Sequence, residues 1–373
     1  MPTSPSPIAV LFGTRPEAIK LAPVVLAMRR EEVPHLVVTT GQHDAMVREV
    51  LDLFDVVPDA DLGLLQPGQT LDAMLARALT RIGAWLDEHK PRAVIVQGDT
   101  TSVLGCTIAA FHQKIPVGHV EAGLRSHDMG HPFPEEMNRR VASTIAKWHF
   151  CPTERSAENL RREGVTHGIQ VVGNTVVDAL RSIGPDASRL GEPLASFLGD
   201  APYLLATAHR RESWDGGIAS VATALRDVLA AHPDLRLVFA THPNPIARGP
   251  VEEILGAEER AMVVDALPYP TFLALLAGAR LVVSDSGGVQ EEGPTLGTPV
   301  LVTRTTTERP EGVDAGAVRI VGTDTARVRS SVAELLDEPA ELEAMARQGG
   351  AIYGDGHAAD RITDILVREA FGA

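Results

Sequence analysis

The sequence predicts an α/β protein with two domains, each built on a parallel sheet that helices cover on both faces. From Ile8 onward, short β-branched runs alternate with amphipathic segments, which is the pattern of such sheets. A chain of 373 residues, 44% of them hydrophobic, is too long for one ordinary core. The periodicity lapses after Leu180, and residues 182–202 carry three prolines and three glycines, as expected of a linker.

Six strands are expected in each half of the chain. In the first half they are residues 8–12, 36–40, 93–97, 116–120, 148–151 and 169–172. In the second half they are residues 203–207, 236–240, 262–264, 281–284, 299–302 and 318–320. We therefore predict a first domain over residues 1–180 and a second over residues 181–356, with a last helix, about 357–373, that packs back on the first domain.

The clearest helix is predicted at residues 70–90, and further helices at 323–336, 339–348 and 357–371. Apolar residues recur at helical spacing in the first of these, so one stripe is expected to face the sheet as core. The stripe consists of Leu71, Met74, Leu75, Ala78, Leu79, Ile82, Trp85 and Leu86.

Composition excludes several classes of function. The formal net charge of −15 argues against nucleic acid and against an anionic membrane surface as partners. No run of about 18 apolar residues occurs, and no basic region precedes Ile8, so a cytoplasmic protein is expected. Cys106 and Cys151 lie in apolar stretches, which predicts buried reduced thiols and no metal site.

Ligands of open α/β sheets lie beyond the carboxyl ends of the strands, so the residues after each strand are the candidates for a site. Gly13 after the first strand allows close approach of a ligand, and Arg15 and Lys20 favour contact with an anion. Asp99 follows a later strand and either caps a helix or acts as an acid. Glu121 ends the next strand and is expected close to Asp99.

Two carboxylates at adjacent strand ends are costly unless they share protons or meet a cation, and this cost favours a function for the pair. A third acidic cluster contains Glu135 and Glu136. The helix dipole explains one acid in a first helical turn without requiring both.

The second half offers candidates for acid–base chemistry and for phosphate binding. His209 follows a strand and is a candidate general acid or base, and Arg210 and Arg211 are candidate phosphate contacts. The turn that contains His242 is a weaker candidate.

The strongest signal is a strand that runs into Ser286, Gly287 and Gly288 and then into a helix, so that free N–H groups and the helix dipole can hold a diphosphate. Glu292 is placed to accept both ribose hydroxyls. The motif G-x-G-x-x-G is absent after the first strand, so a nicotinamide is disfavoured and no cofactor is expected.

Eight blocks together resemble the non-hydrolysing UDP-N-acetylglucosamine 2-epimerase family, over Phe12 to about Asp324. They are FGTRPEAIKLAPVV, QGDTTS, HVEAGLRS, PFPEEMNR, GNTVVDAL, HRRES, DSGGVQEE and TTERPE. The resemblance implies two Rossmann-like domains facing a central cleft, the GT-B fold. It also implies a homodimer that interconverts UDP-N-acetylglucosamine and UDP-N-acetylmannosamine for polysaccharide biosynthesis. The implied route is anti elimination of UDP to a 2-acetamidoglucal, followed by re-addition.

The resemblance also implies roles for individual residues. The implied catalytic residues are Asp99, Glu121, Glu135 and His209. The implied UDP ligands are Arg15, Ser286, Glu292 and Arg309, while Lys20 supports the acids. The chemistry agrees, because the C2–H is too weak an acid for simple deprotonation, so the C1–O bond must break substantially first.

In family members activated by a second substrate molecule, a Gln-His-x-x motif with a polar last residue lies near that molecule. Gln42 and His43 match the motif and Ala45 departs from it, so this form of activation stays open. Two alternative activities use the same kind of UDP-sugar site: a hydrolysing 2-epimerase and a GT-B glycosyltransferase. A nucleotide-sugar-binding module without turnover would leave the acids of the first half unexplained.

Overall fold

The computed structural model describes residues 6–41, 45–66, 68–208, 215–241 and 244–372. The chain divides into two compact units. Unit 1 comprises Met1–Ser182 and Tyr353–Ala373, and unit 2 comprises Ile183–Ile352. The second unit is therefore inserted, in sequence, between the body and the last segment of the first.

Unit 1 contains a seven-stranded sheet in the order β3-β2-β1-β4-β5-β6-β7, and every pairing in it is parallel. The strands are β1 Ile8–Phe12, β2 His35–Thr39, β3 Ala60–Asp61, β4 Ala93–Gln97, β5 Val117–Val120, β6 Trp148–Cys151 and β7 Ile169–Val171. Its helices are α1 Arg15–Arg30, α2 Ala45–Leu53, α3 Leu71–His89, α4 Thr101–His112, α5 Glu135–Ile145, α6 Glu154–Arg162, α7 Thr175–Ile183 and α16 Ala358–Leu366.

Unit 2 contains a six-stranded parallel sheet in the order β10-β9-β8-β11-β12-β13. The strands are β8 Tyr203–Ala208, β9 Arg236–Thr241, β10 Ala261–Val264, β11 Leu281–Ser284, β12 Val300–Val302 and β13 Val318–Ile320. Its helices are α8 Leu194–Leu198, α9 Gly217–Ala231, α10 Pro245–Leu255, α11 Tyr269–Gly278, α12 Val289–Thr295, α13 Pro310–Asp314, α14 Thr325–Asp337 and α15 Pro339–Gln348.

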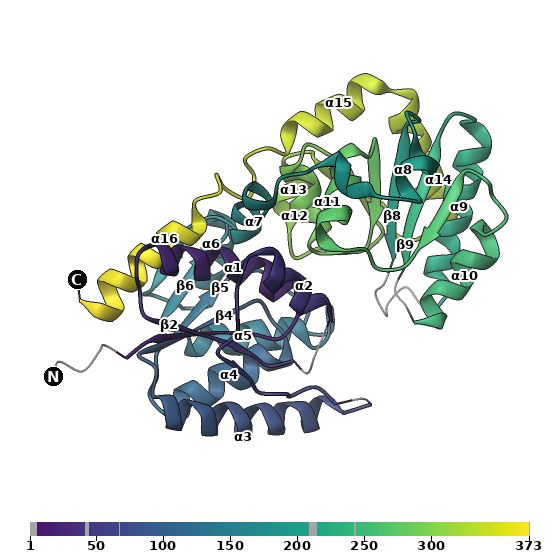
Figure 1. Ribbon diagram of the computed structural model, residues 1–373. Helices are drawn as coiled ribbons and strands as arrows, with labels where there is room; N and C mark the ends of the chain where they lie inside the picture. Colours follow the sequence, from purple (N-terminus) through teal and green to yellow (C-terminus); the bar gives the residue numbers. More distant parts are fainter. Residues whose placement is uncertain (1–5, 42–44, 67, 209–214, 242–243, 373) are drawn as a thin grey trace. The chain divides into compact units, whose positions relative to one another are not determined.

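Helices cover both faces of the sheet in unit 1, with α1 packed against α16 on one face and α3 against α4 on the other (Figure 1). One core cluster of unit 2 joins the sheet to α9, α10, α14 and α15. The predicted α/β class and parallel sheets are confirmed. Among the described helices, none has the length and apolarity that crossing a membrane requires.

The strand order reverses between β1 and β4 in unit 1, and between β8 and β11 in unit 2. Such reversals open a crevice beyond the carboxyl ends of the two central strands, where α/β proteins bind ligands. In unit 1 the crevice is bordered by the residues after Phe12 and Gln97. In unit 2 it is bordered by the residues after Ser284.

The structure corrects two details of the sequence interpretation. Leu71 was expected in the core stripe of the helix at 70–90, but it is the first residue of α3 and is 44% exposed. The short strand β3 was not predicted, since two residues carry no periodicity. Cys106 and Cys151 are buried free thiols, as predicted, and burial raises the pKa of Cys151 to about 12.

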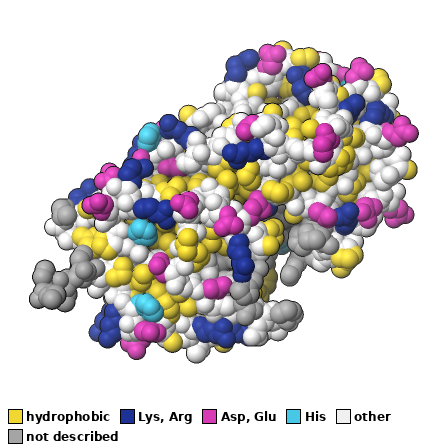
Figure 2. Space-filling model, viewed as in Figure 1, with side chains coloured by type: hydrophobic (Ala, Val, Ile, Leu, Met, Phe, Trp, Pro, Cys, Tyr) yellow, Lys and Arg dark blue, Asp and Glu magenta, His cyan; other side chains and the backbone are white. Residues whose placement is uncertain are grey.

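Basic and acidic side chains are intermixed on the face shown in Figure 2, where the described residues form no broad basic patch.

Gly123 is required by a close approach of backbone to backbone. Its φ is +88°, and a Cβ there would lie 2.1 Å from the Ser156 carbonyl oxygen at the start of α6. We expect Gly123→Ala to lower the free energy of unfolding by about 3 kcal/mol or more, because strain and a backbone clash add.

The matched control is Gly164→Ala, with φ +90° and nothing within 4 Å of the added carbon, which should cost only about 1–2 kcal/mol. Urea denaturation followed by circular dichroism measures both. Equal losses would show that the contact with Ser156 is relieved by a small shift.

Candidate active site

The turn after β1 is built around a buried carboxylate. Glu17 is 2% exposed, and its Oε2 accepts the Gly13 N–H at 2.6 Å and the Thr14 N–H at 3.1 Å. Its Oε1 accepts the Thr100 hydroxyl at 2.7 Å. Burial is the main cause that raises the pKa of Glu17, and the charge of Asp99 adds to it. One side chain therefore ties the loop after β1 to the loop after β4.

Gly13 permits that turn because a Cβ there would lie 2.1 Å from the Thr40 hydroxyl oxygen. Arg15, the first residue of α1, is half-buried at the same edge of the sheet.

Asp99 is held by two residues of α5. Arg139 donates to Asp99 Oδ2 from Nη2 at 2.5 Å and from Nε at 3.1 Å, and the Asn138 amide donates to the Asp99 carbonyl at 2.8 Å. The Asp99 side chain keeps 25% exposure, whereas that of Arg139 is 4% exposed. Asp99 is thus held at a fixed position and still meets solvent.

Arg139 also binds a second carboxylate within α5. Its Nη1 lies 2.8 Å from Glu136 Oε2, which accepts the Ser126 N–H at 3.1 Å as well. Glu136 is completely buried. It therefore orients Arg139, while Glu135 begins the helix and stays half-buried at the same end.

Glu121 lies beyond β5 and pairs with a different cation. Lys20 Nζ is 2.6 Å from Glu121 Oε1, and both side chains are about 95% buried, with exposures of 5% and 4%. The Gln97 amide donates to Glu121 Oε2. The φ of Glu121 is +63°, a left-handed conformation that is strained for a side chain of this size and typical of functional positions.

The structure thus shows how two carboxylates at adjacent strand ends are accommodated. β4 and β5 are neighbours in register from Val94–Val117 to Gln97–Val120, so the loops beyond them meet. Asp99 has Arg139, and Glu121 has Lys20. The sequence did not identify Arg139, because it lies on a helix 40 positions after Asp99. It did not identify Gln97 either, because that residue was assigned only to a strand.

In unit 2, hydroxyl groups shape the turn after β11. The Thr207 and Ser284 hydroxyls are 2.6 Å apart, and Ser284 Oγ accepts the Ser286 N–H at 3.0 Å. The Gln290 amide donates to the Ser286 carbonyl at 3.2 Å. Gly287 and Gly288 follow directly and lead into α12.

Glu292 is 6% exposed and accepts the Tyr269 hydroxyl on Oε1 at 2.7 Å. Tyr269 is the first residue of α11 and was not identified from the sequence. A phenol bound to one carboxylate oxygen fixes the rotamer of Glu292.

Arg309 lies against the glycine turn. A Cβ on Gly287 would meet Arg309 Nη1 at 2.8 Å, so a larger residue would displace the guanidinium. Arg309 Nε donates to Glu291 at 2.5 Å and Nη1 donates to Glu308, which also pairs with Arg304 at 3.0 Å. Arg309 therefore supports the turn through buried ion pairs, and its predicted contact with UDP stays a prediction.

Six predicted site residues lie outside the described residues: Gln42, His43, His209, Arg210, Arg211 and His242. Their roles stay predictions. Within the described part of the chain, no cluster of three His, Cys, Asp or Glu side chains is arranged to hold a metal ion.

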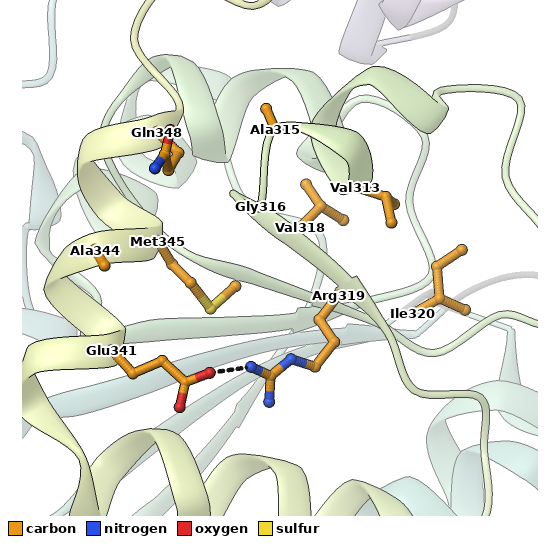
Figure 3. A pocket seen from close by; sticks show the side chains of 10 residues that line it. All are labelled: Val313, Ala315, Gly316, Val318, Arg319, Ile320, Glu341, Ala344, Met345 and Gln348. Carbon is orange, nitrogen blue, oxygen red and sulfur yellow. Dashed lines mark hydrogen bonds and ion pairs between the residues drawn. The ribbon is translucent and has the colours of Figure 1, made fainter.

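One cavity of about 550 Å³ lies at the edge of unit 2, between β13 and α15. Figure 3 shows its apolar lining, with Met345 and Val318 pointing into it and Arg319 paired with Glu341 at its side. The lining contains none of the predicted site residues. This cavity is distinct from the crevice beyond β8 and β11.

Comparisons with known proteins agree over nearly the whole chain. A family model described as UDP-N-acetylglucosamine 2-epimerase matches residues 26–367. The UDP-N-acetylglucosamine 2-epimerase of Escherichia coli K12 is 46% identical over 368 residues, covering 96% of this chain and 98% of that protein. The corresponding protein of Salmonella typhimurium LT2 is 43% identical over 370 residues, covering 96% of this chain and 98% of that protein.

Solved structures agree as well. The UDP-GlcNAc 2-epimerase from Neisseria meningitidis bound to UDP-GlcNAc matches with a TM-score of 0.93 and 38% identity, covering 97% of this chain and all of that chain. The S. aureus MnaA–UDP co-structure matches with a TM-score of 0.91 and 36% identity, covering 97% of this chain and 96% of that chain. The resemblance inferred from the eight sequence blocks is confirmed.

Glu17 is expected to make stability depend on pH. Its pKa in the folded protein is raised above the ordinary 4.5, so the folded state binds this proton more tightly than the unfolded chain. The resulting stabilisation is complete below about pH 4.5 and is lost as pH rises through the folded-state pKa, by at most about 1.4 kcal/mol per pH unit.

Glu17→Gln removes this titration but keeps one oxygen that can accept a hydrogen bond. The unfolding free energy of the wild type minus that of the variant should therefore fall as the pH rises above about 4.5, measured by urea denaturation. A difference that grows with pH would contradict the raised pKa.

Proposed function

The chain belongs to the UDP-N-acetylglucosamine 2-epimerase family, and we propose that it interconverts UDP-N-acetylglucosamine and UDP-N-acetylmannosamine without hydrolysis and without a cofactor. The observation that carries the proposal is the arrangement of Asp99 and Glu121. They lie at adjacent strand ends, each fixed by its own cation. Inversion at C2 requires that a proton leave one face of the sugar ring and arrive at the other, and two fixed carboxyl groups suit this task.

In the first step the C1–O bond breaks and its electron pair stays on the UDP oxygen, while the C2 proton passes to a protein base. A C1–C2 double bond forms, giving 2-acetamidoglucal and UDP. In the second step the UDP oxygen bonds to C1 again and C2 receives a proton on the opposite face. The fixed carboxylates stabilise the positive charge that develops on the ring.

We assign proton transfer to Asp99, Glu121, Glu135 and His209. Asp99 keeps a solvent-exposed part and is anchored by Arg139, so it can meet a substrate without losing its orientation. Lys20 holds Glu121 and offsets its charge.

The UDP group is assigned to the glycine turn of unit 2. The N–H groups of Gly287 and Gly288 precede α12, where partial positive charge favours a diphosphate, and the Ser286 hydroxyl is assigned to the same group. Glu292, oriented by Tyr269, accepts the ribose hydroxyls. Further contacts are assigned to Arg15, Arg210, His242 and Arg309. We propose that the protein acts as a homodimer in the cytoplasm.

Incubation of the protein with UDP-N-acetylglucosamine in deuterated water tests the reaction. UDP-N-acetylmannosamine carrying deuterium at C2 is the expected product, because the abstracted proton exchanges before re-addition. NMR of the sugar follows both the label and the epimer. Free N-acetylmannosamine instead would indicate the hydrolysing reaction, and exchange-free transfer to an acceptor sugar would indicate a glycosyltransferase.

Asp99→Asn and Glu121→Gln should each lower the rate of C2 exchange by about 10²- to 10⁴-fold, since neither amide can take up the proton. UDP affinity, measured by calorimetry, should change little.

Tyr269→Phe should give the reverse pattern, with weaker UDP binding and a smaller loss of kcat, because Glu292 loses its fixed rotamer.

The matched control is Glu154→Gln, at a glutamate whose side chain is 70% exposed on α6, which should behave as the wild type. Parallel loss of UDP affinity and exchange in the Asp99 and Glu121 variants would mean that these residues maintain structure only.

A further inference from the structure

His119 on β5 is a buried histidine that the proposed chemistry does not use. It is 1% exposed, and its Nε2 lies 2.7 Å from the Gly98 carbonyl oxygen. A carbonyl only accepts, so Nε2 must carry the proton of this hydrogen bond. Burial lowers the pKa of His119, which keeps the ring neutral. Nδ1 then bears a lone pair, and it has no partner among the residues that the structure describes.

Gly98 connects β4 to Asp99 in a left-handed conformation with φ +80°. A glycine has no side chain to hold it, so its backbone must be fixed by neighbours. Its N–H donates to the Val120 carbonyl at 3.1 Å, and its carbonyl accepts from His119. The peptide groups on both sides of Gly98 are therefore bound to β5, whose next residue is Glu121.

Three successive residues thus hold the end of β4: His119 and Val120 of β5, and Glu121 directly after it. His119 binds the Gly98 carbonyl, Val120 binds the Gly98 N–H, and Glu121 accepts the Gln97 amide. The contact from Val120 is made by its backbone carbonyl, and the contact from Glu121 is made by a proposed catalytic group. Of the two contacts made by side chains, the one from the His119 ring has no assigned part in the reaction.

We infer that His119 is a positioning residue, whose Nε2–H fixes the Gly98 peptide and thereby sets the separation of the Asp99 and Glu121 carboxylates. The inference rests on the proposed function, in which the two groups serve opposite faces of one carbon. A misplacement of about 1 Å in such a site costs about 100-fold in rate. The α5 contacts alone hold Asp99 from one side only, through Asn138 and Arg139.

The charged and titratable groups that act on His119 are Asp99, Glu121 and Arg125, with His149 across the strand. Two of these groups, Asp99 and Glu121, are acids of the site, so the ring lies close enough to the site for their charges to act on it. Because the ring is neutral, it positions the Gly98 peptide through its hydrogen bond and its shape. This contribution does not depend on a change in the charge of the ring.

His149 on β6 provides a matched control. It pairs in register with His119, is equally buried at 1% exposure, and burial lowers its pKa to about 4. Its hydrogen bond goes to the Ala146 backbone, before β6, and none connects it to the loop after β4. Replacing it perturbs the same core without touching the Gly98 peptide.

The experiment compares His119→Leu, His119→Gln and His149→Leu in the full chain. Leucine keeps the volume of the ring but removes the donor, whereas the glutamine amide nitrogen can reach the position of Nε2. We expect kcat for His119→Leu to fall about 10- to 100-fold with UDP affinity unchanged, and His119→Gln to recover most of it. For His149→Leu, kcat should stay within about threefold of the wild type, although stability falls.

Amide hydrogen exchange of residues 97–102 adds a readout that does not depend on turnover. Exchange at Gly98 should accelerate in His119→Leu, return to the wild-type rate in His119→Gln, and stay at that rate in His149→Leu.

The inference is overturned if both leucine variants lose the same activity, if glutamine gives no rescue, or if Gly98 exchanges equally in all variants. Failure of the proposed function is distinguishable, because the wild type itself would then show no C2 exchange. In that case the amide exchange alone decides whether His119 holds the loop.

Discussion

The architecture of the candidate site depends on the separate neutralisation of two neighbouring carboxylates. Asp99 and Glu121 extend from adjacent strands, where like charges would repel each other strongly in a poorly solvated setting. Arg139 comes from α5 and Lys20 from α1, so the two acids pair with different cations, and Arg139 also pairs with Glu136. Both helices must therefore be in place before the pair can exist.

Unit 2 also contains buried ion pairs between acids and cations, which there support the glycine turn. Glu291 and Glu308 take up the charge of Arg309, and Glu308 also takes that of Arg304, all of them almost fully buried. Removal of one member would leave an unpaired charge in the interior, which costs several kcal/mol, about 3–5 by experience with other proteins. The network thus makes the glycine turn rigid, and a rigid turn presents its N–H groups to an anion at little entropic cost.

The fold was largely predictable from the sequence, because parallel strands buried on both faces produce continuous β-branched runs. The strands at 8–12, 93–97, 148–151, 281–284 and 318–320 agree residue for residue with the structure. The site was less predictable. Periodicity places Asp99 and Glu121 at strand ends but carries no information on which distant cation meets which acid. Tyr269 and His119 were missed for a related reason. Tyr269 lies in an apolar run and His119 inside a strand, and packing alone explains both positions. Only the structure shows their polar contacts.

The return of the chain to unit 1 has a consequence for biosynthesis. α16 packs against α1, and the Asp178 carboxylate caps its start by accepting the Ala358 and Ala359 N–H groups. The segment Tyr353–Ala373 follows unit 2 along the chain, so unit 1 is completed only after unit 2 has been synthesised. Unit 2 can assemble cotranslationally while one helix of unit 1 is still missing, and a chain that stopped before Tyr353 would leave the covering of α1 unfinished.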